Sequence, residues 1–275
     1  MHSVSANGAE IPALGLGTWT LKGPSLPSLI AKAVEAGYRH IDTAAMYGNE
    51  REVGEGIRQC GLDRDELFVT TKVWHTDLAR GALQKSAASS LSRLGLDVVD
   101  LLLIHWPPTD GTSIEKAIGA LNDAKARGMA RHIGISNFPV AYIERAVRAS
   151  EFPLACNQCE YHPMLDQDVV LAACRKHGMT FTSYCPLGRG GDTFSSPAVS
   201  HAAAAYGRTP AQIVLRWHVQ QEGVAAIPRS SNPDHVAANF QIWDFELDDA
   251  QMQAISALRS RNHRICDFDF SPDWD

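Results

Sequence analysis

Four polar side chains that could transfer a proton lie early in the chain, each at or just beyond a hydrophobic run. Asp42 follows YRHI, Lys72 follows LFVTT, His105 follows VDLLLI, and Tyr47 stands five residues after Asp42. A phenol has an unperturbed pKa of about 10, and an adjacent ammonium lowers that value because it favours the phenolate. The set therefore predicts an acidic Tyr47 whose pKa is lowered by Lys72.

Asp42 and His105 have separate tasks in this set. A partly buried lysine tends to lose its proton unless it is paired, so we expect Asp42 to keep Lys72 charged and oriented. A neutral His105 could donate a hydrogen bond to a substrate carbonyl. Taken singly, each residue favours a structural interpretation, as a helix cap, an ion-pair partner or a core histidine. Their combination predicts proton transfer to a carbonyl group.

These residues end strand-like segments that alternate with helical ones. The runs are continuous enough to indicate parallel strands buried on both faces and joined by right-handed crossovers. An open doubly wound sheet is the alternative, but no G-x-G-x-x-G follows a strand. We expect eight strand-helix units in a (β/α)8 TIM barrel, which brings the strand ends to one face. Helical periodicity falls near 25–36, 49–60, 80–94, 114–128, 139–149, 166–177, 197–206, 210–221 and 233–240.

The two ends of the chain add to the barrel. In VSANGAEI, Asn-Gly separates two short runs, which predicts an N-terminal β-hairpin over 1–12 with a type I′ turn. Residues 259–275 lack helical periodicity, and we expect Phe268, Phe270 and Trp274 to pack over the barrel mouth. No linker or repeat divides the 275 residues, so we expect a single domain.

Composition argues against several kinds of partner. The net charge is −6 and long basic runs are absent, so we expect no nucleic-acid partner. The sequence has neither a signal-peptide pattern nor an apolar run of the roughly 20 residues that span a membrane, which predicts a cytoplasmic protein without a membrane partner. Cys156 and Cys159 form a C-x-x-C, but no second Cys/His pair stands at zinc spacing. We therefore expect free thiols, no metal and a monomer.

Longer motifs resemble the aldo-keto reductase family, in particular its short bacterial members that reduce 2,5-diketogluconate and small aldehydes. The resemblance covers nearly the whole chain and rests on GYRHIDTAAMYGNE, VTTKVW, LLIHWP, IGISNF, NQCEYHP and AIPRSSNPDHVAANF. It implies an NADP(H)-dependent reductase of aldehydes and ketones. Its four catalytic positions fall on Asp42, Tyr47, Lys72 and His105, and the residues that would wall its substrate pocket are Trp19, Trp74 and Trp106.

The same resemblance implies that NADP(H) lies extended across the barrel rim without a Rossmann unit. Ser136, Asn137 and Gln158 would bind the nicotinamide carboxamide, and Tyr184 would stack on its ring. Leu187 would lie along the pyrophosphate. The positions at the adenosine 2′-phosphate end fall on Arg229, Ser230, His235 and Asn239.

Three residues at the phosphate end depart from the family pattern. Arg229 stands where lysine is common, His235 where a second arginine is common, and Ala238 where glutamate is common. A histidine is mostly neutral at pH 7, so part of the charge that favours the phosphate is lost. We expect NADPH to be preferred by a reduced margin, with NAD(H) able to compete.

A second hypothesis is a cofactor-binding, redox-sensing regulatory subunit with little turnover, because some members of the family serve ion channels in that way. The short segment 106–113 after the fourth strand favours a small lid and an open pocket. Such a pocket suits small polar aldehydes, 2-oxoaldehydes or keto sugars. The chain also lacks an extension that could dock a partner, which argues against the regulatory role.

Overall fold

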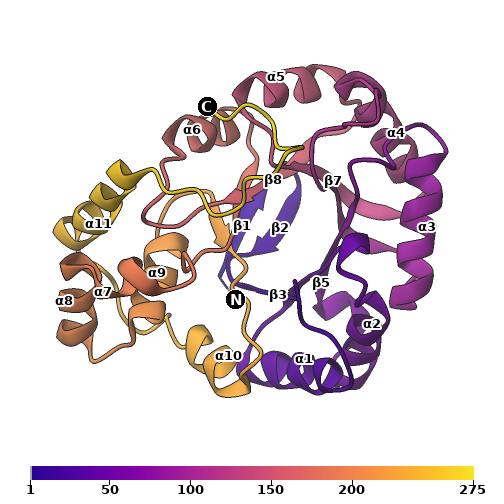
Figure 1. The fold of residues 1–275 in the computed structure, drawn as a ribbon. Helices are drawn as coiled ribbons and strands as arrows, with labels where there is room; N and C mark the ends of the chain where they lie inside the picture. The colour runs from indigo at the N-terminus through magenta and orange to yellow at the C-terminus, as the bar shows by residue number, and fades with distance from the viewer. Residues whose placement is uncertain (1) are drawn as a thin grey trace.

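Eight parallel strands form the centre of the structure, a computed structural model that describes residues 2–275 (Figure 1). Hydrogen bonds between the first and last strands close the barrel, since Gly17 N–H donates to the Pro228 carbonyl at 3.0 Å and Ala226 N–H to the Ala13 carbonyl at 2.9 Å. The predicted (β/α)8 TIM barrel is therefore confirmed. The strands are β3 (Gly15–Gly17), β4 (His40–Asp42), β5 (Phe68–Val73), β6 (Val99–Ile104), β7 (Ala130–Ser136), β8 (Leu154–Glu160), β9 (Thr180–Tyr184) and β10 (Val224–Ala226).

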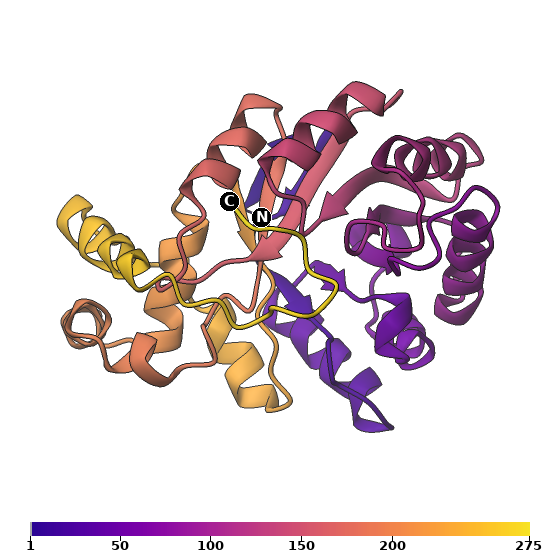
Figure 2. The ribbon, with the colours of Figure 1, turned by 45° about the horizontal axis from the view of Figure 1, so that its top comes forward.

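Helices surround the strands (Figures 1 and 2). The predicted helices are all present, with ends that differ from the prediction by at most two residues, whereas α7 and α11 were not predicted. No helix within residues 2–275 is both long and apolar enough to cross a membrane. The helices are α1 (Ser25–Ala36), α2 (Glu50–Gln59), α3 (Ala82–Leu94), α4 (Ile114–Ala126), α5 (Val140–Ala149), α6 (Asp168–Lys176), α7 (Gly191–Ser195), α8 (Pro197–Tyr206), α9 (Pro210–Val219), α10 (Pro233–Phe240) and α11 (Asp249–Ser256).

Burial on both faces explains why the strands read as continuous apolar runs. Every residue of β6 is buried, because one face points into the barrel and the other packs under helices. Helix starts are set by local caps: the Thr209 side chain accepts a hydrogen bond from Gln212 N–H, with Pro210 as the first residue of α9. Local sequence thus fixes where each helix begins, and burial fixes which face it presents.

The N-terminal hairpin consists of β1 (Ser3–Ala6) and β2 (Ala9–Pro12), as predicted. Its turn has φ 48° at Asn7 and φ 85° at Gly8, the two positive values that a type I′ turn requires. The Asn7 side chain donates to the carbonyls of Leu154 at 2.8 Å and His177 at 2.9 Å. These groups precede or begin strands β8 and β9, so the hairpin lies against the amino end of the barrel.

The C-terminal tail begins after a 3₁₀ turn over Ala257–Arg261 and crosses the other end of the barrel (Figure 2, yellow). Glu160, the last residue of β8, accepts hydrogen bonds from the backbone N–H groups of Ile265 and Cys266, each at 2.6 Å. Beyond this anchor, aromatic side chains of the tail gather around Trp106, with ring-centroid distances of 5.7 Å to Phe268, 5.3 Å to Phe270 and 6.0 Å to Trp274.

Candidate active site

A cavity of about 710 Å³ opens where the barrel strands end, under the C-terminal tail. Strand ends and the loops that follow them supply most of its walls, as expected for the carboxyl end of such a barrel. Lys72 and Ser136 are buried behind this lining, and Ser230, His235 and Asn239 lie outside it. The predicted residues that line the cavity are Trp19, Asp42, Tyr47, Trp74, His105, Trp106, Asn137, Gln158, Tyr184, Leu187 and Arg229.

Asp42, Lys72 and Tyr47 meet beneath this cavity. Asp42 ends β4, and the next turn, Ala45–Tyr47, carries the phenol back over the end of β5. The fully buried Nζ of Lys72 lies 2.5 Å from Asp42 Oδ1 and 3.3 Å from Tyr47 Oη, and it also donates to the Thr43 carbonyl at 2.8 Å. The ammonium therefore has three oxygen acceptors, and two of the residues that supply them, Asp42 and Tyr47, line the cavity.

The protonation of this group differs from the sequence prediction in one respect. Burial raises the pKa of Tyr47 well above its ordinary value of 10.0, and the charge of Asp42 raises it further. The prediction of a lowered pKa for Tyr47 is therefore wrong: burial, the largest cause, and the charge of Asp42 both disfavour the phenolate. Burial also lowers the pKa of Lys72, and Asp42 opposes that shift. Tyr47 consequently holds its proton firmly.

His105 stands beside Tyr47 at the end of β6. Its ring centroid lies 5.6 Å from that of Tyr47 and 5.1 Å from that of Trp74, both in edge-on geometry. Burial lowers the pKa of His105 well below 6.5, and Lys72 lowers it further. The imidazole is therefore neutral at physiological pH and can donate one N–H hydrogen bond. That agrees with the sequence expectation of a neutral donor.

Polar side chains at the ends of β7 and β8 are linked to the same site. Gln158 Nε2 donates to Asp42 Oδ2 at 2.7 Å, and Ser136 Oγ donates to the Gln158 carbonyl at 2.6 Å. Asn137 Nδ2 donates to the His105 carbonyl at 3.0 Å, and Tyr184 Oη donates to Asn137 Oδ1 at 2.8 Å. This network fixes two amides and one aromatic ring against the cavity, a donor set that fits a planar carboxamide and its ring.

The far side of the cavity carries positive charge. Arg229 is exposed, and its Nε donates to the Trp19 carbonyl at 3.2 Å. It also lines a neighbouring cavity of about 250 Å³ that includes Lys22 and Lys32. Next to it α10 begins, with Asn232 Oδ1 accepting from Asp234 N–H at 2.9 Å. Cations beside a helix start suit a phosphate, so this end fits the phosphates of an extended dinucleotide.

The other three residues predicted to bind the phosphate end of the cofactor do not line the large cavity. Ser230 Oγ donates to the Asn232 carbonyl at 3.4 Å, which holds the turn before α10. His235 is exposed on α10, and Asn239 is buried near the end of the same helix. The structure thus brings Arg229 to both cavities and leaves the other three residues on or beside α10.

Several lining residues were not assigned to the site from the sequence, including Arg189 and Phe194. Arg189 has φ 57° within a run of positive φ angles from Gly188 to Gly191, so the backbone turns sharply there. The glycines of PLGRGG were a signal for such a loop, but only Leu187 was singled out. Within residues 2–275, no group of three or more His, Cys, Asp or Glu side chains could hold a metal ion.

Comparisons with known proteins agree with this geometry. A family model described as the aldo/keto reductase family matches residues 13–260. The methylglyoxal reductase DkgB of Escherichia coli O157:H7 is 39% identical over 267 residues, 96% of this chain and 99% of that protein. A protein assigned as a 2,5-diketo-D-gluconic acid reductase B has a crystal structure with TM-score 0.96 and 42% identity, covering 100% of this chain and 98% of that one. An aldo-keto reductase of Bombyx mori, in complex with NADP, has TM-score 0.91 and 34% identity, covering 99% and 97%.

Proposed function

The chain belongs to the aldo/keto reductase family, and from that premise we propose that it reduces small aldehydes, 2-oxoaldehydes and keto sugars to alcohols with NADPH. Membership makes it an oxidoreductase, and the names of its relatives support carbonyl reduction. The observation that carries the proposal is the position of Lys72 Nζ, 2.5 Å from Asp42 and 3.3 Å from the phenol of Tyr47. The cavity beside this phenol has room for a substrate and a nicotinamide ring.

The cofactor would occupy the lining of the cavity. Ser136, Asn137 and Gln158 would bind the carboxamide, and Tyr184 would stack on the ring. Leu187 would lie along the pyrophosphate, and the phosphate end would meet Arg229, Ser230, His235 and Asn239. When bound, NADPH supplies the hydride that reduces the carbonyl carbon.

Tyr47 then acts as the proton donor. Hydride addition leaves negative charge on the former carbonyl oxygen, and an alkoxide is a far stronger base than a phenolate. The proton therefore moves from Tyr47 Oη to that oxygen even though burial raises the phenol's pKa. Lys72 donates a hydrogen bond to the phenolate that results, and Asp42 keeps the ammonium in place. A lysine without Asp42 would lose its proton in so buried a position.

His105 orients the substrate in this scheme. Its neutral ring lies edge-on to both Tyr47 and Trp74, so one N–H can point at the carbonyl oxygen that Tyr47 will protonate. Two donors converging on one oxygen fix the carbonyl carbon toward the hydride donor. A charged His105 would repel the nearby Lys72 ammonium. Burial prevents that charge, because it lowers the pKa of His105.

The substrate class follows from the lining and from the relatives. Trp19, Trp74 and Trp106, with Phe268 and Phe270 from the tail, give the cavity an aromatic wall. Methylglyoxal is a 2-oxoaldehyde and 2,5-diketogluconate is a keto sugar acid, the compounds for which two relatives are named. We propose the same classes here, with NADPH preferred over NADH by a reduced margin because His235 replaces a cation.

The test is a steady-state assay of cofactor oxidation with each cofactor and a panel containing methylglyoxal, 2,5-diketogluconate, a simple aliphatic aldehyde and a bulky cyclic ketone. We expect turnover of the small substrates, typically 1–10³ s⁻¹ for enzymes, with a higher kcat/KM for NADPH than for NADH. Binding of NADPH with very slow oxidation across the whole panel would instead favour the regulatory subunit.

The proposal also covers the state of the protein. We propose a cytoplasmic monomer without a nucleic-acid partner, supported by the net charge of −6 and the lack of long basic runs. Light scattering of the purified protein tests the oligomeric state, since a dimer would double the mass of 29.9 kDa.

A further inference from the structure

Two cysteines far apart in the chain touch at the wall of the active-site cavity. Cys185 follows the last residue of β9 and Cys266 lies in the C-terminal tail, 81 positions later, yet their Sγ atoms are 4.0 Å apart. Both residues line the cavity of about 710 Å³. A small solute that enters the cavity therefore meets both sulfurs together.

The pairing of β8 with β9 and the carboxylate of Glu160 bring Cys185 and Cys266 together. Glu160 ends β8 and pairs with Tyr184 at the end of β9, so Cys185 begins its loop directly beside Glu160. The Oε2 atom of Glu160 accepts the backbone N–H of Cys266 at 2.6 Å, and Oε1 accepts that of Ile265 at 2.6 Å. Two neighbouring strand ends thus hold one thiol each.

The two thiols have different acidities because of their contact. The sulfur–sulfur hydrogen bond with Cys266 lowers the pKa of Cys185, and burial opposes that shift. The same hydrogen bond, together with burial, raises the pKa of Cys266. By contrast, burial raises the pKa values of Cys156 and Cys159 to about 12. A thiolate is the reactive form of cysteine, so Cys185 is suited to react first and Cys266 to follow.

We propose that Cys185 and Cys266 are a redox modification site, at which a hydroperoxide converts the two thiols to a reversible disulfide. In the first step the Cys185 thiolate attacks one peroxide oxygen, the O–O bond breaks, and the released hydroxide takes a proton to become water. In the second step the Cys266 sulfur attacks the resulting sulfenic acid, the S–O bond breaks, and the thiol proton leaves with the hydroxide as a second water. Hydrogen peroxide is reduced, and two thiols are oxidised to one disulfide.

Bond formation needs a local movement. The sulfurs must approach from 4.0 Å to a bonded distance of about 2.05 Å. Cys185 already has φ 49° in the left-handed region, and three positions further along its loop, residues 188–191 are also at positive φ. Residues 262–275 of the tail contain no helix or strand. Both partners are therefore on irregular backbone, which can adjust more readily than a strand.

The disulfide would have a consequence for the site, and this step rests on the proposed function. The bond would tie the tail to the loop that carries Leu187 and Arg189, and both of these residues line the cavity. A loop that cannot move away from the tail can neither admit nor release an extended cofactor freely. We expect the oxidised protein to exchange NADPH at least about tenfold more slowly, because lid and loop motions often limit such steps.

The first experiment maps the bond and does not depend on activity. The protein is treated with a small excess of hydrogen peroxide, blocked with N-ethylmaleimide, digested and analysed by mass spectrometry. We expect a cross-linked peptide pair containing Cys185 and Cys266 that dithiothreitol abolishes. Both thiols remaining open to N-ethylmaleimide, or separate oxidation of each to a sulfinic acid, would overturn the proposal.

Variants identify the partners. The Cys185→Ser and Cys266→Ser proteins should each lose the cross-link, whereas Cys60→Ser should retain it, because Cys60 is half-buried on the outer surface and its Sγ contacts the Ile57 carbonyl instead. A cross-link that survives in Cys266→Ser would mean that another sulfur is the partner and would refute the assignment.

The second experiment measures the release of NADPH from the reduced and the oxidised protein by stopped-flow fluorescence. Slower release in the oxidised form, reversed by dithiothreitol and missing in peroxide-treated Cys266→Ser, supports the consequence for the site. Equal rates in the two forms would contradict it. Failure of the proposed function is distinguishable, since it would appear as a reduced protein that consumes no NADPH while the cross-link still maps to Cys185 and Cys266.

Discussion

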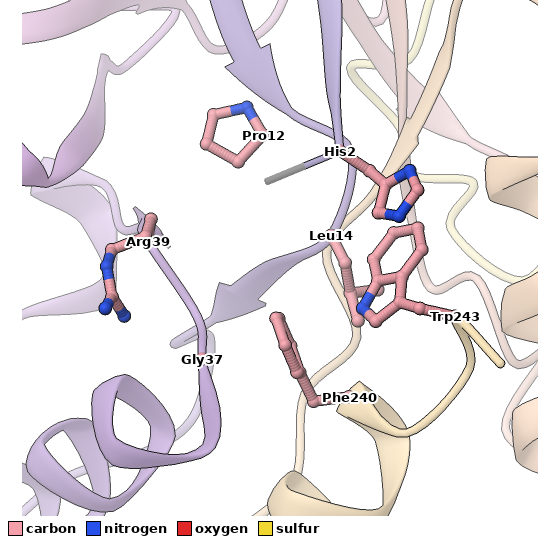
Figure 3. A pocket seen from close by; sticks show the side chains of 7 residues that line it. All are labelled: His2, Pro12, Leu14, Gly37, Arg39, Phe240 and Trp243. Atoms are coloured by element: carbon pink, nitrogen blue, oxygen red, sulfur yellow. The ribbon is translucent and has the colours of Figure 1, made fainter.

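The barrel has a cavity at each end, and the two differ in the chemistry of their walls. The cavity at the amino end measures about 360 Å³ and is lined by residues of the N-terminal hairpin and its flanks, of the segments before β3 and β4, and of the end of α10 and the loop after it (Figure 3). Its cation, Arg39, donates from Nη1 to the carbonyls of Val34 at 3.0 Å and Tyr38 at 2.9 Å, so it serves the end of α1. The lining is otherwise mostly apolar or aromatic: His2, Pro12, Leu14, Gly37, Phe240 and Trp243.

One ion pair at each end of the barrel extends this comparison, a part-buried pair at the amino end and a buried pair at the carboxyl end. At the amino end, Asp100 accepts from Arg64 at 2.6 Å and from Val69 N–H at 2.8 Å, and Arg64 also donates to two backbone carbonyls. At the carboxyl end, the further partners of Asp42 and Lys72 include the phenol of Tyr47, a group that carries a proton and lines a cavity. The difference shows that an ion pair can take part in a reaction only where a proton donor and a cavity for a substrate lie next to it.

The largest effect is expected when the phenol at the carboxyl end is removed. Tyr47→Phe should lower turnover by about 10²- to 10⁴-fold, because a positioned general acid contributes about that factor. Its binding of NADPH, measured by fluorescence titration, should stay within about twofold.

Tyr38→Phe is the matched control at the amino end, where the phenol donates to the Val236 carbonyl at 3.1 Å. It should cost about 1 kcal/mol of unfolding free energy and leave turnover unchanged. Equal losses of turnover in Tyr47→Phe and Tyr38→Phe would contradict the assignment of the reaction to the carboxyl end of the barrel.

The second effect concerns the two ion pairs. Lys72→Met leaves Asp42 buried without its cation, so the free energy of unfolding should fall by about 3–5 kcal/mol, with a loss of turnover of at least about a hundredfold. Urea denaturation and the steady-state assay measure the two quantities.

Arg64→Met at the amino end should lower the unfolding free energy by about 1–3 kcal/mol and leave kcat/KM within about twofold, since Asp100 keeps the Val69 N–H. A large loss of turnover in Arg64→Met would show that ion pairs at both ends support the reaction.

The third effect is on the choice of cofactor. His235→Arg adds a permanent charge to α10, so the ratio of kcat/KM for NADPH to that for NADH should rise by about tenfold, or about 1.4 kcal/mol. The same charge change at the amino end, His2→Arg, should leave the ratio unchanged. An equal rise in both variants would mean that net charge, and not the position of His235, sets the preference.

The smallest effect is expected from pH. The pKa of Tyr47 is raised well above 10.0 and that of His105 is lowered well below 6.5, so neither group changes its protonation between these values. The reductive kcat at saturating NADPH should therefore vary by less than about threefold from pH 6.5 up to the pH at which Lys72 loses its proton, since burial lowers the pKa of Lys72 from 10.5. A steady fall of kcat that begins below neutral pH would show instead that the phenol of Tyr47 is acidic, as the sequence suggested.

Much of the fold could be predicted because the relevant signals are local. Continuous apolar runs, helical periodicity and the Asn7-Gly8 turn identified the strands, nearly all helices and the hairpin. Strand ends of a parallel barrel lie on one face, so Asp42, Lys72 and His105 could be placed together before any distance was known. The short helices α7 and α11 were not predicted because their helical periodicity in the sequence is weak.

The sequence by itself determined the barrel, the family and the residues at the ends of its strands. Tertiary structure alone decided their protonation, since burial and the charge of Asp42 act through space and reverse the acidity predicted for Tyr47. It also decided the contact of Cys185 with Cys266, because Glu160 holds a tail segment more than a hundred residues away. Spacing along a chain encodes periodicity and register, whereas electrostatics and long-range contacts depend on which surfaces are brought together in space.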